Sequence, residues 1–158
     1  MKKPASDSPS APGAAAAPPP HCLFCAIAER RLDAHVVAET DSVLVFLDKT
    51  PVFKGHCLVV PKAHAETLVD LPRASVDPLM GVARGIARAV ELSLGADGTF
   101  VAMNNRVSQS VAHLHVHVVP RRKKDGLRGF FWPRVKYASA DEMADFAAKI
   151  AAAFDPAF

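Results

Sequence analysis

Residues 113–119 read His-Leu-His-Val-His-Val-Val, and this stretch decides both the fold and the chemistry that the chain can support. Successive side chains of a β-strand point to opposite faces, so this pattern puts apolar side chains on one face and imidazoles on the other. The apolar set is Leu114, Val116 and Val118, and the histidine set is His113, His115 and His117. The strand is therefore expected to pack its apolar face into a core and to line up three histidines on the opposite face.

Three aligned imidazoles suit nucleophilic catalysis. A neutral imidazole is a good nucleophile near pH 7 because its ordinary pKa is about 6.5. Attack of the central residue, His115, on phosphorus would give a phosphohistidine-type intermediate that water then hydrolyses. The flanking imidazoles can hold the non-bridging oxygens and orient the central ring. The alternatives are an incidental histidine cluster on a solvated strand face and a plain metal site.

The rest of the chain predicts short strands flanked by helices. Strands are expected at 36–39, 43–47, 57–60 and 99–103, and helices at 23–30, at 76–94 and from 139 onwards. The first two strands are separated by Thr40-Asp41-Ser42, which is typical of a hairpin turn. Short links favour antiparallel pairing, because parallel strands need a long crossover. The expected fold class is α+β, with one antiparallel sheet and helices packed on one side.

Two helices carry boundary signals. For the helix at 76–94 we expect Ser75 as N-cap and Gly95 as the C-terminal stop. The last helix is expected to start at a capping box formed by Ser139 and Glu142. Its apolar residues recur at helical spacing and are expected to be buried: Met143, Phe146, Ile150 and Phe154.

Composition bounds the class of protein. Residues 1–20 are rich in Ala, Pro and Ser and are expected to form a disordered tail, followed by one domain over 21–158. The net charge of +3 is too mild for a nucleic-acid footprint and is compatible with an anionic small substrate. No apolar run is long enough to span a bilayer, and no signal peptide develops, so a cytoplasmic protein is expected. Three cysteines without an export signal argue against a disulfide framework.

The sequence HLHVHVV resembles the signature of the histidine-triad (HIT) family, and the preceding Gln109-Ser110-Val111 also matches the approach to the triad. The resemblance covers about residues 22–137. It implies that His115 is the nucleophile, that His117 contacts the phosphate and that Ser110 hydrogen-bonds the phosphate or the leaving group. Further residues are implied near the phosphate and ribose or in the catalytic set: Gln109, Asn104, and His56 of the Gly55-His56 pair.

The same resemblance implies a nucleoside pocket upstream. Asp48, at the end of the strand Val43–Asp48, would accept hydrogen bonds from the ribose hydroxyls. The base would be walled by Phe46, Leu23, Phe24 and Ile27. The alternatives are that these apolar residues belong to the ordinary core, and that Asp48 is a turn residue.

A zinc site is also implied by the resemblance. Cys22 and Cys25 form a Cys-x-x-Cys pair, which supplies two of the four ligands that zinc prefers. Many bacterial HIT proteins complete such a site with a histidine after a Pro-Lys pair and with the first triad histidine, here His64 and His113. The zinc would be structural and no organic cofactor is expected. The alternative is a reduced pair of buried thiols without metal.

Some positions depart from the family pattern or stay open. Ser108 stands where relatives commonly have glycine before the Gln-Ser pair, so the phosphate loop is expected to differ in shape. Lys49 stands where many relatives have an apolar residue. The basic run 121–124 is either a solvated loop or a phosphate clamp, and Trp132 lies either near a partner's active site or in a dimer core.

Together these features predict a HIT-family hydrolase or transferase that cleaves a phosphorus–nitrogen or phosphorus–oxygen bond of a nucleoside phosphate, with a purine expected as the base. The family resemblance alone implies a homodimer. Phosphoramidate hydrolysis leads, and hydrolysis of dinucleoside polyphosphates is the alternative. The partner is a small nucleotide, with no nucleic acid and no membrane. Rivals from other classes are a nucleotide-binding regulatory protein with little turnover and a zinc-structured interaction module.

Overall fold

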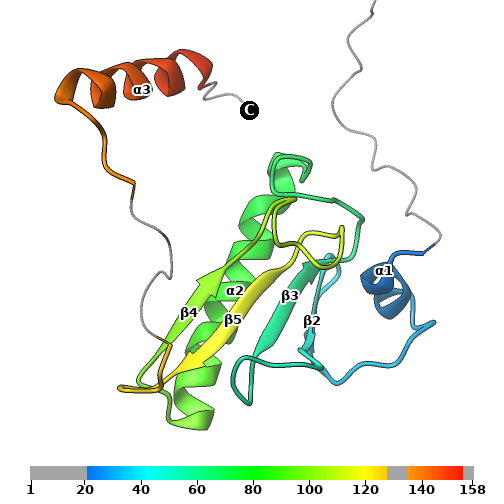
Figure 1. The fold of residues 1–158 in the computed structure, drawn as a ribbon. Helices are drawn as coiled ribbons and strands as arrows, with labels where there is room; N and C mark the ends of the chain where they lie inside the picture. Colours follow the sequence, from blue (N-terminus) through cyan, green and yellow to red (C-terminus); the bar gives the residue numbers. More distant parts are fainter. Residues whose placement is uncertain (1–20, 128–134, 155–158) are drawn as a thin grey trace, which may run out of the picture. The chain divides into compact units, whose positions relative to one another are not determined.

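A computed structural model describes residues 21–127 and 135–154, so the predicted tail at 1–20 and Trp132 lie outside the described residues. In chain order the elements are α1 (Leu23–Ala28), β1 (Val36–Glu39), β2 (Val43–Leu47), β3 (Cys57–Pro61), α2 (Arg73–Leu94), β4 (Gly98–Ala102), β5 (Val116–Arg121) and α3 (Ala140–Ala153). The chain divides into two compact units, one up to Lys123 and one from Lys124 onwards. The first unit holds α1, α2 and every strand (Figure 1).

The strands form one antiparallel sheet in the order β1-β2-β3-β5-β4. The strand β5 therefore lies between β3 and β4, and His117 is paired with Leu58 on one side and Ala102 on the other. A residue held by ladders on both sides has a fixed backbone position, which suits a residue with a chemical role.

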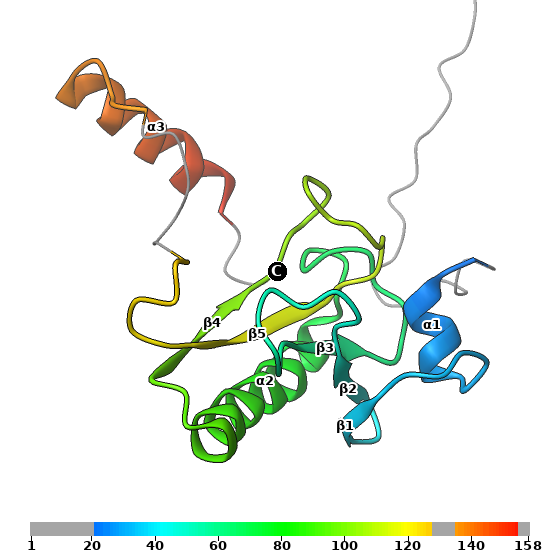
Figure 2. The ribbon, with the colours of Figure 1, turned by 60° about the horizontal axis from the view of Figure 1, so that its bottom comes forward.

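The two faces of the sheet are covered by different helices. The main core joins α2 to one face, where Leu79, Leu114 and Val116 are fully buried. A second cluster joins Phe24 and Ile27 of α1 to the opposite face, at Leu44, Phe46, Leu58 and Val60 of β2 and β3. Figure 2 shows α2 running along one side of the sheet and the short α1 beyond β2. The predicted α+β class is confirmed, with α2 as the helical layer.

The predicted strand at 113–119 is shifted, since β5 runs over Val116–Arg121. The β3–β5 ladder extends from Cys57↔Val118 to Val59↔Val116, so continued pairing would oppose Leu114 to Pro61. Pro61 has no N–H to donate, and the Leu114 N–H instead donates to the Ala65 carbonyl at 2.7 Å. The predicted alternation of faces nevertheless holds, because Leu114, Val116 and Val118 all belong to the main core.

The helix α2 starts three residues earlier than predicted, at Arg73, with Pro72 and not Ser75 as its N-cap. Pro72 is suited to this place because it has no N–H to leave unsatisfied, and the Ser75 N–H already donates to its carbonyl at 2.8 Å. At the other end the predicted stop is confirmed: Gly95 has φ +60, which costs a glycine little.

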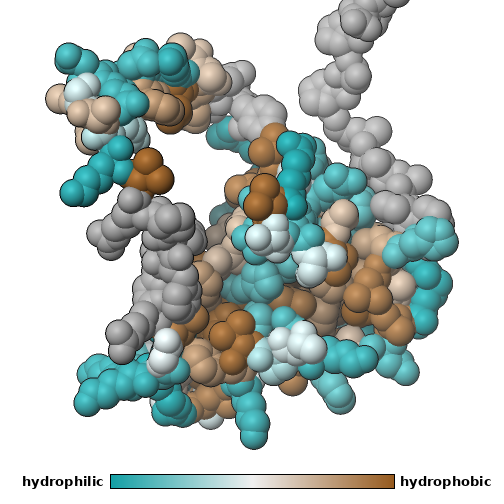
Figure 3. Space-filling view, viewed as in Figure 1, coloured by the Kyte–Doolittle hydropathy of each residue, from teal (hydrophilic) through white to brown (hydrophobic). Residues whose placement is uncertain are grey.

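In the second unit, α3 begins as predicted but does not bury its apolar residues. The Ser139 side chain accepts a hydrogen bond from the Glu142 N–H at 3.1 Å. The expected burial is wrong for all four residues, whose exposed fractions are 53% for Met143, 47% for Phe146, 69% for Ile150 and 71% for Phe154. Helical spacing predicts an apolar stripe but not a surface to cover it, and brown and tan atoms show on α3 in Figure 3.

Within residues 21–127 and 135–154, none of the helices combines the length and apolar character required to cross a bilayer.

Candidate active site and metal centre

The predicted nucleophile, His115, lies just before β5 and is only 3% exposed. Its Nδ1 is 2.7 Å from the backbone carbonyl oxygen of His113. A carbonyl only accepts, so Nδ1 carries the proton and Nε2 carries the lone pair. The Phe24 ring packs against this imidazole in a T-shaped arrangement, with ring centroids 5.2 Å apart. The arrangement fixes one tautomer of His115 and leaves Nε2 as its nucleophilic atom.

A chain of polar contacts runs from the third triad histidine to the predicted ribose-binding carboxylate. The Nδ1 of His117 lies 3.0 Å from Nε2 of His56, and Nδ1 of His56 lies 3.3 Å from Oδ2 of Asp48. The other carboxylate oxygen accepts the Thr50 N–H at 2.8 Å. The ring centroids of His115 and His117 are 4.8 Å apart, so this chain of polar contacts ends beside the predicted nucleophile. Asp48, His56 and His117 come from three separate parts of the sequence.

Burial keeps the imidazoles of His56 and His117 neutral near pH 7. Burial lowers the pKa of His117 to about 4, helped by the neighbouring imidazoles of His115 and His56 and opposed by Asp48. The pKa of His56 is lowered chiefly by burial, while the Asp48 carboxylate raises it. A neutral imidazole offers one donor and one acceptor nitrogen, so hydrogen bonding rather than charge defines this part of the site.

The loop before the triad is held by its own side chains. The amide of Gln109 donates to the Glu66 carbonyl at 2.6 Å and accepts the Arg106 N–H at 2.7 Å. The Asn104 side chain donates to the Ser108 carbonyl at 3.1 Å. Both residues predicted near the phosphate and ribose thus bind backbone in this structure, whereas Ser110 is exposed.

Sequence reasoning missed one contact of that loop, and the structure adds the backbone conformation of Ser108, a position that the sequence had already singled out. The side-chain oxygen of Asn105 accepts the Leu68 N–H at 2.7 Å, which joins the loop to the segment after β3. Ser108 has φ +58, the left-handed conformation that glycine adopts most readily. The serine therefore takes the kind of backbone conformation that glycine favours, at some cost in strain. The only signals in the sequence for these two features were the polar residues of the loop and the serine at a position where relatives have glycine.

Three of the four residues predicted to wall a base pocket are buried. Phe46 is 3% exposed, Phe24 5% and Ile27 6%, and all three belong to the cluster under α1. The rings of Phe24 and Phe46 meet edge-on at 5.3 Å. Leu23 is 48% exposed and lies outside that cluster. The three buried residues pack together in this cluster, and the ring of Phe24 also contacts that of His115.

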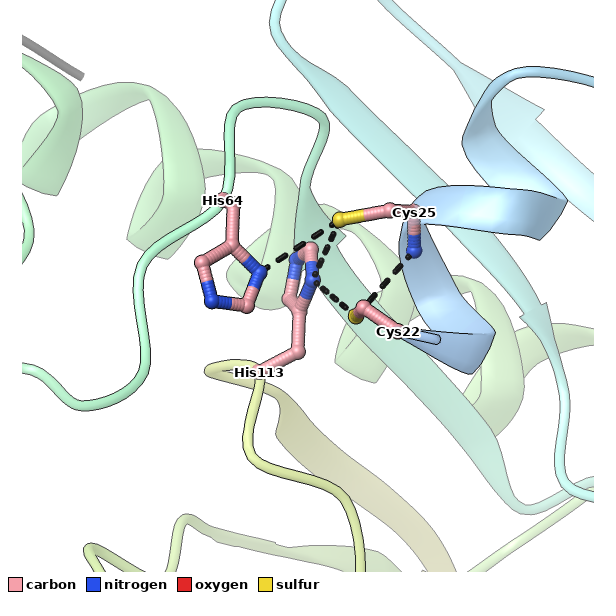
Figure 4. A group of neighbouring side chains, drawn as sticks. All are labelled: Cys22, Cys25, His64 and His113. Atoms are coloured by element: carbon pink, nitrogen blue, oxygen red, sulfur yellow. Dashed lines mark hydrogen bonds between the residues drawn. The ribbon is translucent and has the colours of Figure 1, made fainter. Parts of the chain in front are cut away.

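The four predicted zinc ligands come together in one place, shown in Figure 4. Cys22 and Cys25 are supplied by the start of α1, His64 by the segment after β3, and His113 by the segment before β5. The Nδ1 of His113 is 3.3 Å from Sγ of Cys22 and 3.5 Å from Sγ of Cys25, and the Nδ1 of His64 is 3.4 Å from Sγ of Cys25.

This donor set fits zinc. With Zn–S and Zn–N bonds of about 2.3 and 2.05 Å, a tetrahedron has N–S edges of about 3.5 Å, close to the separations observed. The Nε2 of His113 lies 2.8 Å from the Pro61 carbonyl, so its Nδ1 keeps the lone pair that a metal needs. Burial raises the pKa of Cys25 to about 12, with Cys22 adding to the effect, so a cation is needed to hold its thiolate.

Arg122 of the basic run has a role that the sequence did not suggest. Its guanidinium donates to the carbonyl of Gly95 at 2.8 Å and also to that of Leu94. These carbonyls end α2, where helices leave backbone acceptors unsatisfied and favour a positive charge. Arg122 therefore caps α2.

The fold and site define a small α+β protein with a buried, tautomer-fixed histidine beside a Cys₂His₂ cluster. Comparison with known proteins agrees, since a sequence model described as the HIT domain matches residues 29–124. The chain belongs to the HIT family.

Three relatives illustrate the match. A HIT-like protein of Methanocaldococcus jannaschii is 43% identical over 109 residues, which cover 66% of this chain and 82% of that protein. Adenosine 5'-monophosphoramidase of Schizosaccharomyces pombe is 33% identical over 114 residues, covering 71% of this chain and 83% of that enzyme. The crystal structure of a zinc-bound histidine triad family protein from Mycobacterium smegmatis superposes with a TM-score of 0.66 at 36% identity, covering 85% of this chain and 98% of that one.

Proposed function

We propose that this HIT-family protein hydrolyses nucleoside phosphoramidates, with His115 as the nucleophile and a nucleotidyl-histidine as the intermediate. The observation that carries the proposal is the 2.7 Å contact between His115 Nδ1 and the His113 carbonyl. It leaves the lone pair on Nε2 of His115, the nitrogen that attacks phosphorus in this proposal. The similarity to an adenosine 5'-monophosphoramidase supports this substrate class.

The reaction has two displacement steps. In the first, the Nε2 lone pair of His115 forms a bond to phosphorus, the phosphorus–nitrogen bond of the substrate breaks, and the leaving amine takes up a proton. In the second, water attacks the same phosphorus, loses a proton, and displaces Nε2 of His115. The products are a nucleoside monophosphate and an amine. Two in-line displacements at one phosphorus return the enzyme to its starting state.

The neighbouring residues are assigned supporting roles. His117, whose ring is 4.8 Å from that of His115, would donate to a phosphate oxygen, as would the exposed Ser110 hydroxyl. Asp48 would accept from the ribose hydroxyls, since a carboxylate can accept from both hydroxyls of a vicinal diol. Gln109 and Asn104 are proposed to support the phosphate loop through the backbone contacts that they make.

Cys22, Cys25, His64 and His113 would hold a structural zinc ion. When bound, zinc would supply a cross-link between α1 and the two segments that carry the histidines. The chemical steps above use His115 and its neighbours alone. We also propose a homodimer, and a cytoplasmic location in which Cys22, Cys25 and Cys57 stay reduced.

The test is a paired assay of wild type and His115→Ala on adenosine phosphoramidate and on a diadenosine polyphosphate. Wild type is expected to turn over the phosphoramidate, and the variant to lose at least roughly 10³-fold in kcat while still folding. His35→Ala is the matched control, because His35 is an exposed histidine away from the triad. Faster turnover of the polyphosphate would move the assignment to the alternative hydrolase activity. Nucleotide binding without turnover of either compound would make the protein a binder.

A further inference from the structure

His56 is placed between two groups that demand opposite tautomers. Its Nδ1 lies 3.3 Å from Oδ2 of Asp48, which can only accept a hydrogen bond when ionised. The same Nδ1 lies 3.3 Å from the backbone nitrogen of Val52, whose N–H can only donate. A single ring nitrogen cannot satisfy both groups at once, because it carries either a proton or a lone pair.

The choice made at Nδ1 of His56 is passed on to His117. The other nitrogen of His56, Nε2, is 3.0 Å from Nδ1 of His117, so one of the two must donate to the other. If Nδ1 of His117 carries the proton, its Nε2 carries the lone pair, and if Nδ1 carries the lone pair, its Nε2 carries the proton. His56 is 3% exposed and is therefore shielded from water that could break this coupling.

We infer that Asp48 and Val52 select between two tautomers of His56, and that ribose bound at Asp48 thereby puts a proton on Nε2 of His117. This inference rests on the proposed function, in which Asp48 accepts the ribose hydroxyls, and adds a control of catalysis by the sugar.

The two arrangements can be written atom by atom. With Asp48 available, His56 Nδ1–H donates to Oδ2, His117 Nδ1–H donates to His56 Nε2, and His117 Nε2 has a lone pair. With Asp48 engaged by ribose hydroxyls, His56 Nδ1 accepts from Val52, His56 Nε2–H donates to His117 Nδ1, and His117 Nε2 carries the proton. In the change, the His56 Nδ1 proton leaves to water through Asp48, the His117 Nδ1 proton crosses to His56 Nε2, and water supplies a proton to His117 Nε2. The net charge stays the same.

The position of Asp48 suits this control. Its Oδ1 is held by the Thr50 N–H at 2.8 Å, which turns Oδ2 toward His56, and its side chain is 19% exposed and so within reach of a ligand. Burial lowers the pKa of both His56 and His117, so the imidazoles are neutral at pH 7 and tautomer is the variable. Only the second arrangement gives the third triad histidine an N–H donor for a phosphate oxygen or leaving group.

The first experiment reads tautomers directly in the free full-length protein, by long-range ¹H–¹⁵N NMR of ¹⁵N-histidine at pH 7. Wild type is expected to show His56 protonated at Nδ1, and Asp48→Ala to show it protonated at Nε2, with the signals assigned from His56→Gln and His117→Gln. Asp41→Ala, which removes an exposed carboxylate elsewhere, is the matched control and should match wild type. The same His56 tautomer in wild type and in Asp48→Ala overturns the inference.

The second experiment adds adenosine or 2′,3′-dideoxyadenosine. Adenosine is expected to shift His56 and His117 to the Nε2–H forms, and the dideoxy compound, which lacks the hydroxyls, to leave them unchanged. In wild type, kcat for the phosphoramidate of dideoxyadenosine should be at least roughly tenfold lower than kcat for the phosphoramidate of adenosine. In Asp48→Ala the two kcat values should be about equal. Adenosine binding without a tautomer shift overturns the ribose coupling. If Asp48→Ala changes the His56 tautomer but wild type binds no nucleoside, the proposed function is contradicted, whereas the control of the His56 tautomer by Asp48 stands.

Discussion

Replacing Ser108 by glycine is expected to stabilise the protein, although glycine in a loop usually does the opposite. Ser108 is exposed and has φ +58, in the left-handed region where a Cβ is crowded against the backbone. An L-residue pays about 1–2 kcal/mol for that conformation. Glycine relieves it but loses about 0.5–1 kcal/mol through its larger backbone entropy in the unfolded chain. The difference is a gain of roughly 0.5–1 kcal/mol.

Thermal and urea unfolding of the full-length protein measure this effect. A gain of that size raises Tm by roughly 2–4 °C in a domain of this size and moves the urea midpoint upward without changing the slope. Ser42→Gly is the matched control, because Ser42 is also an exposed turn serine and does not have a positive φ. It is expected to lose roughly 0.5–1 kcal/mol. Equal destabilisation of both variants would refute the reasoning, since the two sites would then not differ in strain.

The remaining predictions concern acid, metal and packing. Burial lowers the pKa of His117 to about 4, so between about pH 6.5 and pH 4 the unfolded state binds a proton that the folded state does not, and the free energy of unfolding falls by up to roughly 3 kcal/mol as the pH is lowered through this range. A pH series of urea unfolding on wild type and His117→Gln measures this, and an equally steep loss in the variant would assign the pH dependence to another group. Extracting zinc with a chelator is expected to lower Tm by several degrees and to make Cys22 and Cys25 reactive to a thiol reagent, with Cys57, 3% exposed, still slow; unchanged Tm after verified metal removal would contradict a structural role. Leu79→Ala, at a fully buried position, should lower the free energy of unfolding by about 3–5 kcal/mol, whereas Ile150→Ala, at a position 69% exposed, should change it by no more than about 0.5 kcal/mol. Urea unfolding at several protein concentrations measures both, and a large loss for Ile150→Ala would mean that a partner covers α3.

Features that depend on local pattern were predictable from the sequence. Alternation in residues 113–119 gave the two faces of the triad segment because it depends only on the two-residue period of extended chain. Gly95 was recognisable as a helix stop for an equally local reason, its freedom to take φ +60. The Cys₂His₂ cluster was predictable only through the family resemblance, since nothing local relates Cys22 to His113 across 91 residues.

Features that depend on partners distant in the sequence were not predictable. The ladder start at Val116 depends on Pro61 arriving opposite Leu114, which requires the register of β3. The exposure of Phe146 depends on what lies over α3, and periodicity carries no information about that. The placement of Gln109 near phosphate stays a prediction, and what the sequence did not foresee is that its amide donates to the backbone carbonyl of Glu66, 43 residues away. In each case the sequence did not reveal which residue, distant along the chain, would make the contact.

His113 connects the two centres that the sequence suggested separately. Its Nδ1 faces the sulfurs of Cys22 and Cys25, its Nε2 donates to the Pro61 carbonyl, and its own carbonyl oxygen accepts a hydrogen bond from Nδ1 of His115. The ring and the carbonyl belong to one residue, so a force that fixes the ring also limits rotation of the peptide that orients the nucleophile. The neighbouring Leu114 is fully buried and its N–H is tied to Ala65, which removes the freedom on the other side of that peptide. The tautomer of His115 therefore depends both on packing in the core and on the Cys22 and Cys25 side chains that contact the His113 ring. A substitution at Cys22 or Cys25 is therefore expected to loosen the orientation of the His115 ring first.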